Sequence, residues 1–329
     1  MKTGYWQRVW RELRKNRMAM AGLSVVGILL FVALLAPMLA NNKPLVYIES
    51  GRIYLPIFID YPEFYEVDFR NGHAPGFKIM PPIPYTYSEY DLDSIVLPPN
   101  LTHLFGTDEQ GRDLAARMIH GTRVSLVVGF VAVVIYVALG IVIGALAGYY
   151  GGWIDMFFSR FIEIVICFPT FFLILTVLAI IDTSTTNSLL SIMIVIGLTR
   201  WTETARIVRG EFLKLRESDY VVASKALGLK DSRIILRHIL PNALSPLLVT
   251  ATFGIASTIL IESSLSFLGF GVNPPTPSWG DILSQSREFM DFAWWLTLIP
   301  GLAIFMTITS YNLVGEGLQD ATDPKSLPR

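Results

Sequence analysis

The sequence is dominated by apolar runs that are long enough to cross a lipid bilayer. A helix needs about 20 apolar residues to span the hydrocarbon core, which is roughly 30 Å thick. Lipid offers no hydrogen-bond partners, so backbone groups in such runs must pair internally, as they do in a helix. Six runs meet this requirement, at residues 18–40, 124–148, 155–181, 189–208, 243–264 and 294–314. The sequence therefore predicts an all-α membrane protein with six transmembrane helices.

The composition supports this fold class. Only 16% of the residues are charged and 52% are hydrophobic, whereas a soluble domain is about one quarter charged. The mean hydropathy is +0.50. The one cysteine, Cys167, lies inside an apolar run. It has no partner for an internal disulfide, and we interpret it as a small buried hydrophobic residue.

Basic residues are concentrated in two segments and indicate the orientation. Lys and Arg are frequent in residues 1–17 and again in residues 209–237. Such residues are enriched on the cytoplasmic side of membrane proteins. Four predicted spans separate the two segments, so both lie on the same side. We therefore expect both termini, including a tail at 315–329, to be cytoplasmic. The run at 18–40 is too long for a signal-peptide core, and we interpret it as an uncleaved first span.

Residues 41–123 form a polar segment between the first two spans, and we expect it to be extracytoplasmic. It is rich in Pro, Tyr and acidic residues. Two short β-like runs flank Ser50 and Gly51, which predicts a hairpin. Two roles remain open for this segment: a solvated cap with structural work only, or contact with a substrate-binding protein.

Residues 209–241 lie between the fourth and fifth spans and contain a short predicted helix. Ser218 can serve as its N-cap, and Asp219 lies in the first turn, where a carboxylate suits the helix dipole. Three residues recur at helical spacing on one face: Tyr220, Ala223 and Leu227. A helix of this kind between two spans is suited to dock on a soluble protein.

A turn and a second helix are predicted to follow. Gly228 supplies the left-handed conformation that ends the first helix. Asp231 can cap the second helix, which we expect to include His238 and to end at Pro241. A new apolar run begins after this proline.

This loop resembles the "EAA" loop of ABC-importer permeases, in the branch that carries dipeptides, oligopeptides and nickel. The resemblance rests on the stretch from Tyr220 to Gly228 and on the stretch from His238 to Asn242. This chain has Val-Ala-Ser at 222–224 where the general motif has Glu-Ala-Ala, and His238 where Ile is usual. Further stretches also resemble the second, "C-type" permease of that branch: His103 to Asp113, Ser266 to Gly271 and Asp320 to Pro324.

The resemblance implies a permease domain at residues 124–314 whose cytoplasmic coupling loop, 209–241, binds a separate ATPase. Tyr220 and Leu227 would anchor the contact, Gly228 would set the angle between the two helices, and a small-residue surface would allow close approach. The full set of coupling residues is Asp219, Tyr220, Ala223, Ser224, Ala226, Leu227, Gly228, His238 and Pro241. ATP and Mg²⁺ would bind the partner, and no cofactor would bind this chain.

The resemblance also implies partners and a location. These are ABC ATPase subunits, a second and homologous permease subunit, an extracytoplasmic solute-binding protein and the lipid bilayer of the bacterial cytoplasmic (inner) membrane. The solute would be a peptide or a peptide-like molecule.

Other candidate residues lie within the spans. Gly140, Gly144 and Gly148 recur every four residues and predict a smooth face for close helix packing. Glu163 and Glu262 are candidates for the solute pathway, because charged residues within spans are often functional. Glu163 and nearby Arg160 are also close enough to a membrane interface to serve a structural role.

The sequence lacks the motifs of several other functions. It has no GxxxxGK[ST] nucleotide-binding loop, so we do not expect it to hydrolyse ATP. It has no HExxH motif or Cys-rich spacing, so we expect no metal site, and nothing predicts binding to nucleic acid. The main alternative is a self-sufficient secondary transporter or channel, which would predict paired carboxylates, basic residues or broken helices at mid-bilayer, with internal inverted repeats; the sequence shows neither a repeat nor a cluster of charges at the midplane. A receptor or assembly protein that acts through residues 41–100 is a third possibility.

Overall fold

The computed structural model describes residues 5–64, 67–70, 76–181 and 188–323, and most of these residues are helical. The chain divides into two compact units, which are described separately. The first unit consists of Met1–Val25, Val128–Ile261 and Thr307–Arg329. The second unit consists of Val26–Val127 and Glu262–Met306.

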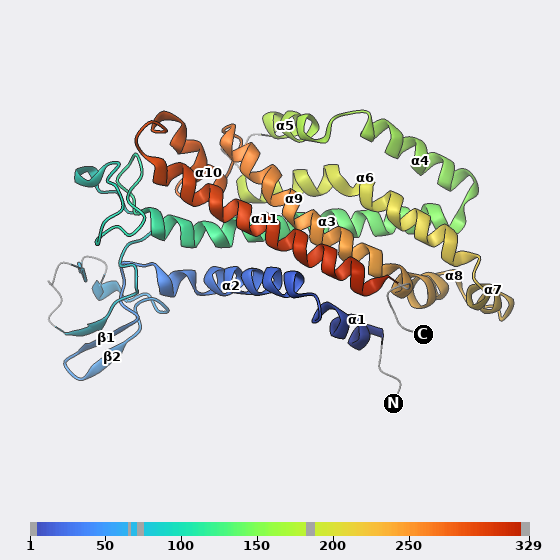
Figure 1. The fold of residues 1–329 in the computed structure, drawn as a ribbon, viewed down its shortest axis with the longest axis horizontal. Coiled ribbons are helices and arrows are strands. Elements are labelled where there is room, and N and C mark those ends of the chain that lie inside the picture. The colour runs from blue at the N-terminus through green and yellow to red at the C-terminus, as the bar shows by residue number, and fades with distance from the viewer. Residues whose placement is uncertain (1–4, 65–66, 71–75, 182–187, 324–329) are drawn as a thin grey trace. The chain divides into compact units, whose positions relative to one another are not determined.

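Among the described residues, four helices are long and apolar enough to cross a membrane (Figure 1). They are α2 (Arg17–Leu39), α3 (Leu114–Tyr150), the continuous helix Asp231–Phe267 that includes α9 (Leu240–Phe267), and α11 (Trp294–Thr322). The number rises to five if the bent pair α4 (Gly152–Ile166) and α5 (Thr170–Ile180) forms one span. The expected fourth span corresponds to α6 (Ser188–Arg216), which is not among the helices that are both long and apolar enough to cross a membrane. The structure thus supports four or five of the six expected spans.

The expected third span is broken rather than merely kinked. The axes of α4 and α5 differ by 83°, and Pro169 occupies the N-cap position of α5 with a non-helical ψ of 121°. Proline lacks an N–H and its ring clashes with the preceding turn, so a helix tends to stop before it. Cys167 is the C-cap of α4 and is exposed. The expectation that this cysteine is buried was therefore wrong, because it lies at the break.

Within the first unit, the glycine stripe of α3 faces α6. A Cβ on Gly140 would lie 2.5 Å from Thr204 Cβ, and a Cβ on Gly144 would lie 2.5 Å from Ala205 O. A Cβ on Gly148 would lie 2.7 Å from Arg209 O. Atoms of ordinary residues do not approach this closely, so glycine permits the contact between the two helices.

The N-terminal basic segment forms α1 (Tyr5–Leu13), which is amphipathic. Val9 and Leu13 are buried against Ala19 of α2 and Ala321 of α11, and these residues form one small cluster of the first unit. The basic residues of α1 lie on its exposed side. The chain therefore begins with a helix that covers the ends of two long helices.

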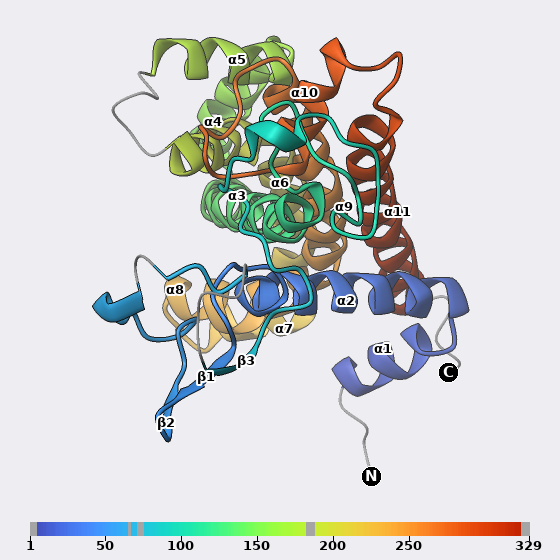
Figure 2. The same cartoon turned by 90° about the vertical axis from the view of Figure 1, so that its left-hand side faces the viewer.

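The second unit contains a small antiparallel sheet with the order β2-β1-β3, seen in Figure 2. Its strands are β1 (Val46–Glu49), β2 (Arg52–Tyr54) and β3 (Phe77–Ile79). Ser50 and Gly51 both have positive φ, 52° and 78°, as a two-residue hairpin turn of type I′ requires. The predicted hairpin is confirmed. The third strand was not predicted, because it is only three residues long and distant in sequence.

Short elements complete the chain. The second unit has α10 (Trp279–Gln285) and 3₁₀ turns at Pro62–Phe64, Leu92–Ser94 and Ser286–Glu288. Of the two tryptophans at the start of α11, Trp294 is exposed, whereas Trp295 is buried. The Trp295 indole Nε1 donates to Thr107 O at 3.2 Å. Trp295 thus anchors the loop before α3 rather than lipid.

Candidate functional site

The polar segment between α6 and α9 forms two short helices, α7 (Asp219–Ala226) and α8 (Asp231–Ile234), at one end of the first unit (Figure 1). We call residues 218–241 the α7–α8 segment. Gly228 adopts φ +73°, as predicted. Its N–H donates to Lys225 O at 2.9 Å, and the N–H of Leu229 donates to Ser224 O at 3.2 Å. This pair of bonds is the Schellman motif, which requires a left-handed residue and fixes the turn after α7.

One face of α7 is packed against the helix bundle. Val221 is fully buried in a cluster with Phe212 of α6 and Ile234 of α8. Ser224, one turn further on, is also buried, and its hydroxyl donates to Tyr220 O at 2.7 Å. These contacts hold α7 in a defined orientation.

The opposite face of α7 is apolar and exposed. Leu227 is 82% exposed, Val222 is 54% exposed and Tyr220 is 41% exposed; Ala223 and Ala226 are exposed as well. We call these five residues the α7 patch. The expectation that Ser224 belongs to the outward surface was wrong, since it lies on the packed face; Val222 takes its place. An exposed apolar group of this kind on one short helix suits contact with a partner.

Two expected helix caps are replaced by other contacts. Ser218 occupies the N-cap position of α7, but its hydroxyl donates to Leu215 O and makes no cap bond. Lys230 occupies the N-cap position of α8, and Asp231 is its first helical residue. The Asp231 carboxylate accepts a hydrogen bond from the Tyr149 hydroxyl at 2.6 Å. Asp231 therefore ties α8 to the end of α3.

Pro241 does not end the second helix, contrary to expectation. Residues Ile235–Ile239 form a π-helical turn that leads into α9, and the N–H of Leu240 donates to Ile235 O. A π turn is wider than an α turn and shifts the hydrogen-bond register by one residue. Pro241 follows the π turn directly, and it has no backbone N–H that would require a hydrogen-bond acceptor. The helix therefore runs without interruption from Asp231 to Phe267.

Tyr149 contacts both helices of the α7–α8 segment and the end of α6, and the sequence analysis did not identify it. Its hydroxyl binds Asp231, and the Lys225 ammonium lies 4.8 Å from its ring centroid. The Arg216 guanidinium Nη1 lies 3.5 Å from Tyr149 O. The available signal was a tyrosine at the end of a long apolar run, a position typical of a membrane interface.

The start of α9 also contacts α7. The Asn242 amide donates to His238 O at 2.6 Å and to the Tyr220 hydroxyl at 3.4 Å. His238 is half-buried, and Pro241 is exposed. The two stretches that resemble the "EAA" loop, which begin at Tyr220 and at His238, are thus brought together in space.

The two carboxylates proposed for the solute pathway have different surroundings. The Glu163 side chain is 60% exposed and accepts from Arg160 Nη1 at 2.6 Å. Glu262 is fully buried in the second unit, where its carboxylate accepts from Ser266 Oγ at 2.8 Å. Glu163 thus has an exposed partner one turn away, whereas Glu262 is enclosed by hydroxyl groups.

The His103–Asp113 stretch forms a buried ionic network in the second unit. The Asp108 carboxylate accepts from Arg112 Nε at 2.7 Å and from Arg117 Nη1. Arg117 Nη2 donates to Asp281 of α10 at 2.7 Å. All but Asp281 have side chains at most 2% exposed. Burial raises the pKa of the Asp281 carboxyl above its usual value, and the nearby Arg117 cation opposes this. The sequence analysis treated this stretch only as a signature and did not foresee the network.

A charged residue near the middle of α6, Arg200, was also missed. Its side chain is 11% exposed. The signal in the sequence was an arginine near the middle of the run 189–208, six residues before Arg206 and close to Leu198 and Trp201.

Comparison with known proteins gives consistent similarities. A family model described as "Binding-protein-dependent transport system inner membrane component" matches residues 140–327. One described as "N-terminal TM domain of oligopeptide transport permease C" matches residues 4–56. The chain is 35% identical over 320 residues to the "Dipeptide transport system permease protein DppC" of Alkalihalophilus pseudofirmus, which covers 97% of this chain and 90% of that protein. It is 44% identical over 228 residues to a "Putative peptide transport system permease protein" of Brucella suis, covering 69% and 75%.

A solved structure has a similar fold. A chain from inward-facing conformations of the MetNI methionine ABC transporter matches with a TM-score of 0.52 and 17% identity, over 62% of this chain and 96% of that one. At this identity, the likeness concerns the fold alone.

Proposed function

Since the chain belongs to the binding-protein-dependent transport system inner membrane components, the permease subunits of ABC importers, we propose that it forms part of a translocation path for peptides or peptide-like solutes. The relatives named as dipeptide and peptide permeases support this solute class. ATP would be hydrolysed on a separate subunit, and this chain would take no catalytic part.

The proposed topology has six spans. α6 forms the fourth of these spans, in addition to those that the structure supports, because its first half is apolar and its ionic residues lie nearer its end. Residues 1–17, the α7–α8 segment and residues 315–329 lie on the cytoplasmic side of the bacterial inner membrane, and residues 41–123 lie outside. The enrichment of basic residues in α1 and around α7 supports this orientation.

The exposed α7 patch is the observation that carries the coupling role. Its apolar side chains are unusually accessible for a segment that is fixed to the bundle on its other face. In the proposed complex, Leu227 and Tyr220 anchor α7 in a cleft on the ATPase, because large apolar side chains in a fitted pocket dominate such contacts.

Motion of the ATPase would pass into the permease through contacts that do not depend on the patch. Val221 packs on α6, the Gly228 turn fixes α8, and Asp231 binds Tyr149 of α3. Differential docking of the ATPase with and without ATP would then bias the equilibrium between inward-open and outward-open states.

Two further partners complete the proposed importer. A second, homologous permease subunit would supply the other half of the path. An extracytoplasmic solute-binding protein would contact residues 41–123, where exposed side chains such as Ile53 and Phe77 lie on the small sheet.

The test is co-purification of the chain with its ATPase from a strain that expresses the whole transporter. Leu227→Glu places a charge in the apolar contact, and we expect it to reduce the ATPase recovered by at least about tenfold. Leu227→Met, a volume-conserving change, is the matched control and should recover wild-type amounts.

Two results would contradict the proposal. Wild-type recovery of ATPase by Leu227→Glu would remove α7 as the docking element. Movement of peptide into vesicles that hold the purified chain alone, without ATP, would identify a self-sufficient carrier instead of an ABC permease.

A further inference from the structure

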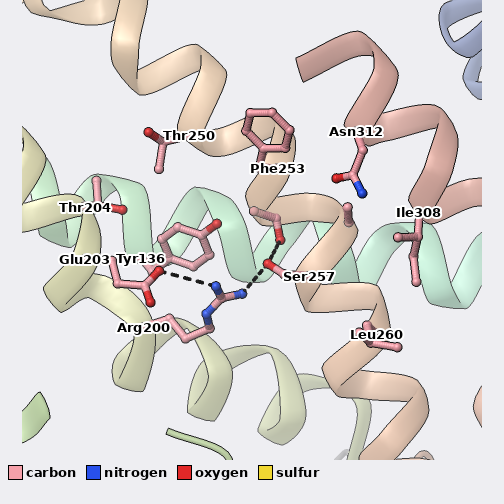
Figure 3. A pocket seen from close by; sticks show the side chains of 12 residues that line it. Tyr136, Arg200, Glu203, Thr204, Thr250, Phe253, Ser257, Leu260, Ile308 and Asn312 are labelled. Atoms are coloured by element: carbon pink, nitrogen blue, oxygen red, sulfur yellow. Dashed lines mark hydrogen bonds and ion pairs between the residues drawn. The ribbon is translucent and has the colours of Figure 1, made fainter. Parts of the chain in front are cut away.

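A cavity of about 450 Å³ lies inside the first unit, among α3, α6, α9 and α11 (Figure 3). This volume is within the range of small-molecule sites in proteins. Its wall combines polar and apolar side chains. The polar ones include Tyr136, Arg200, Glu203, Thr204, Ser257 and Asn312.

Arg200 is the cation of this cavity. It lies 12 residues after Ser188, the start of α6, which corresponds to about 18 Å along a helix and, in the proposed topology, to a position near the middle of the span. Its Nη1 donates to Ser257 Oγ at 2.8 Å and to Thr258 Oγ1 at 3.3 Å, and its guanidinium lies 5.4 Å from the Tyr136 ring centroid. Contacts from α9 and α3 thus hold this side chain in place.

The counter-ion of Arg200 is weakly placed. The carboxylate of Glu203, one turn along α6, lies 3.5 Å from Arg200 Nη2. The Glu203 side chain is 62% exposed, whereas that of Arg200 is 11% exposed. A guanidinium favours two parallel bonds to one carboxylate, which the single 3.5 Å contact does not provide.

A second wall residue has an unmet hydrogen bond. Thr204 is fully buried, and among the described residues its Oγ1 has no hydrogen-bond partner. Buried polar atoms in native proteins are almost always paired, so each exception calls for an explanation. Thr204 lines the same cavity as Arg200, and Figure 3 shows both side chains on α6 beside Tyr136. A bound molecule with polar groups would satisfy this hydroxyl.

We propose that this cavity binds the transported solute, and that Arg200 holds the solute's carboxylate in place of Glu203. The inference rests on the proposed transport function and adds a recognition element to it. The carboxylate accepts two hydrogen bonds from the guanidinium. Phe253, Leu260 and Ile308 supply apolar wall for a side chain of the solute.

The competing role for Arg200 is purely structural. Its bonds to Ser257 and Thr258 join α6 to α9, and loss of that join would lower stability without any effect on selectivity. The test must therefore measure preference for a carboxylate as well as affinity.

The experiment measures binding to the purified full-length chain in detergent by saturation-transfer NMR. The two probes are L-alanyl-L-alanine and L-alanyl-L-alanine amide, which differ only in the charged carboxylate. We expect the wild type to prefer the acid by about tenfold, because hydrogen bonds to a charged group are stronger than those to a neutral one.

Three variants separate recognition from folding. Arg200→Gln should lose the preference for the acid, and Arg200→Lys should keep part of it, because the charge remains without the planar fork. Arg206→Gln removes a cation from an exposed position of the same helix outside the cavity, and it should bind as the wild type does. Size-exclusion profiles of the variants report folding.

Equal binding of the two probes by the wild type, or an unchanged preference in Arg200→Gln, would overturn the proposal. Loss of the preference in Arg206→Gln would overturn it as well, since the effect would then be general charge. Recovery of the ATPase by the wild type decides the transport function separately, so an importer that fails this binding test loses only the recognition element.

Discussion

The His103–Arg117 stretch of the second unit and the α7–α8 segment of the first unit are both polar sequences beside a long helix, yet they dispose their side chains in opposite ways. In the former, Asp108, Arg112 and Arg117 are almost completely buried, and the Asp108 carboxylate accepts from both arginines. In the latter, Leu227 and Tyr220 are exposed, and only the opposite face of α7 is packed against the helix bundle. A buried ionic network fixes a shape, whereas an exposed apolar patch leaves a contact to be completed. Both stretches resemble the same family of permeases, so the resemblance does not distinguish their roles. The burial of their side chains does.

The largest effect should come from opening the buried network. Asp108→Ala leaves the Arg112 and Arg117 cations buried without their shared partner, which should destabilise the protein by roughly 3–5 kcal/mol. The matched change, next to the α7–α8 segment, is Glu217→Ala, which removes the carboxylate of a surface pair with Arg216 and should cost less than about 1 kcal/mol. Thermal denaturation in detergent measures both. Equal denaturation midpoints for the two variants would contradict the proposed difference between the buried network and the exposed ion pair.

A pair of glycines gives the next comparison. Gly111 and Gly228 both have positive φ, 71° and 73°. A Cβ on Gly111 would lie 1.7 Å from Asp91 O, whereas a Cβ on Gly228 would have no atom within 4 Å. Gly228→Ala should therefore cost only the left-handed strain of about 1–2 kcal/mol.

Gly111→Ala should cost clearly more, because the loop backbone must move as well. The readout is the difference between the denaturation midpoints of the two alanine variants. A larger shift for Gly228→Ala would mean that the α7–α8 segment is packed more tightly than its exposure indicates.

The smallest effect is a dependence of stability on pH. Burial raises the pKa of the Asp113 carboxyl from its usual 3.8, and the hydrogen bond with His103 opposes this. A raised folded-state pKa means that protonation favours the folded state. The contribution of Asp113 is therefore fully present below pH 3.8 and is lost as pH rises through the folded-state value.

Asp113→Asn should remove this loss. Its denaturation midpoint should fall less than that of the wild type as pH is raised from about 3.8 towards neutral. Asp219→Asn, in the exposed segment, is the matched control. Parallel pH curves for wild type and Asp113→Asn would show that this carboxyl does not contribute.

Four or five of the six spans, the Ser50–Gly51 hairpin and the Gly228 turn could be predicted because each depends on local sequence. Long apolar runs demand helices in lipid, and positive φ favours small residues at defined positions. The two prolines show the limit of this logic. Pro169 breaks its helix by 83°, whereas Pro241 is accommodated by the adjacent π turn. The same residue type has different outcomes, because the register of the preceding turn is not visible in the sequence.

Parts of the candidate site that depend on distant contacts could not be predicted. Ser224 and Ala223 are adjacent small residues, and only the packing of Val221 on Phe212 decides which of them faces outward. Tyr149 meets Asp231 across 82 positions of the chain. Arg200 is visible in the sequence as an arginine within an apolar run. Its proposed role depends on Ser257 and Thr204, which the fold places beside the same cavity.

The uninterrupted helix that begins at Asp231 has a mechanical consequence. Between Asp231, next to the α7 patch, and Ser257, which holds Arg200, lie 26 residue steps, or about 39 Å of helix. If this stretch moved as a rigid lever about a pivot near Asp231, a tilt of about 10° would displace the Ser257 end by about 7 Å. A displacement of that size is larger than the length of any hydrogen bond. A small rotation imposed on α8 would therefore be enough to release the guanidinium of Arg200 from α9 and to reshape the cavity around it.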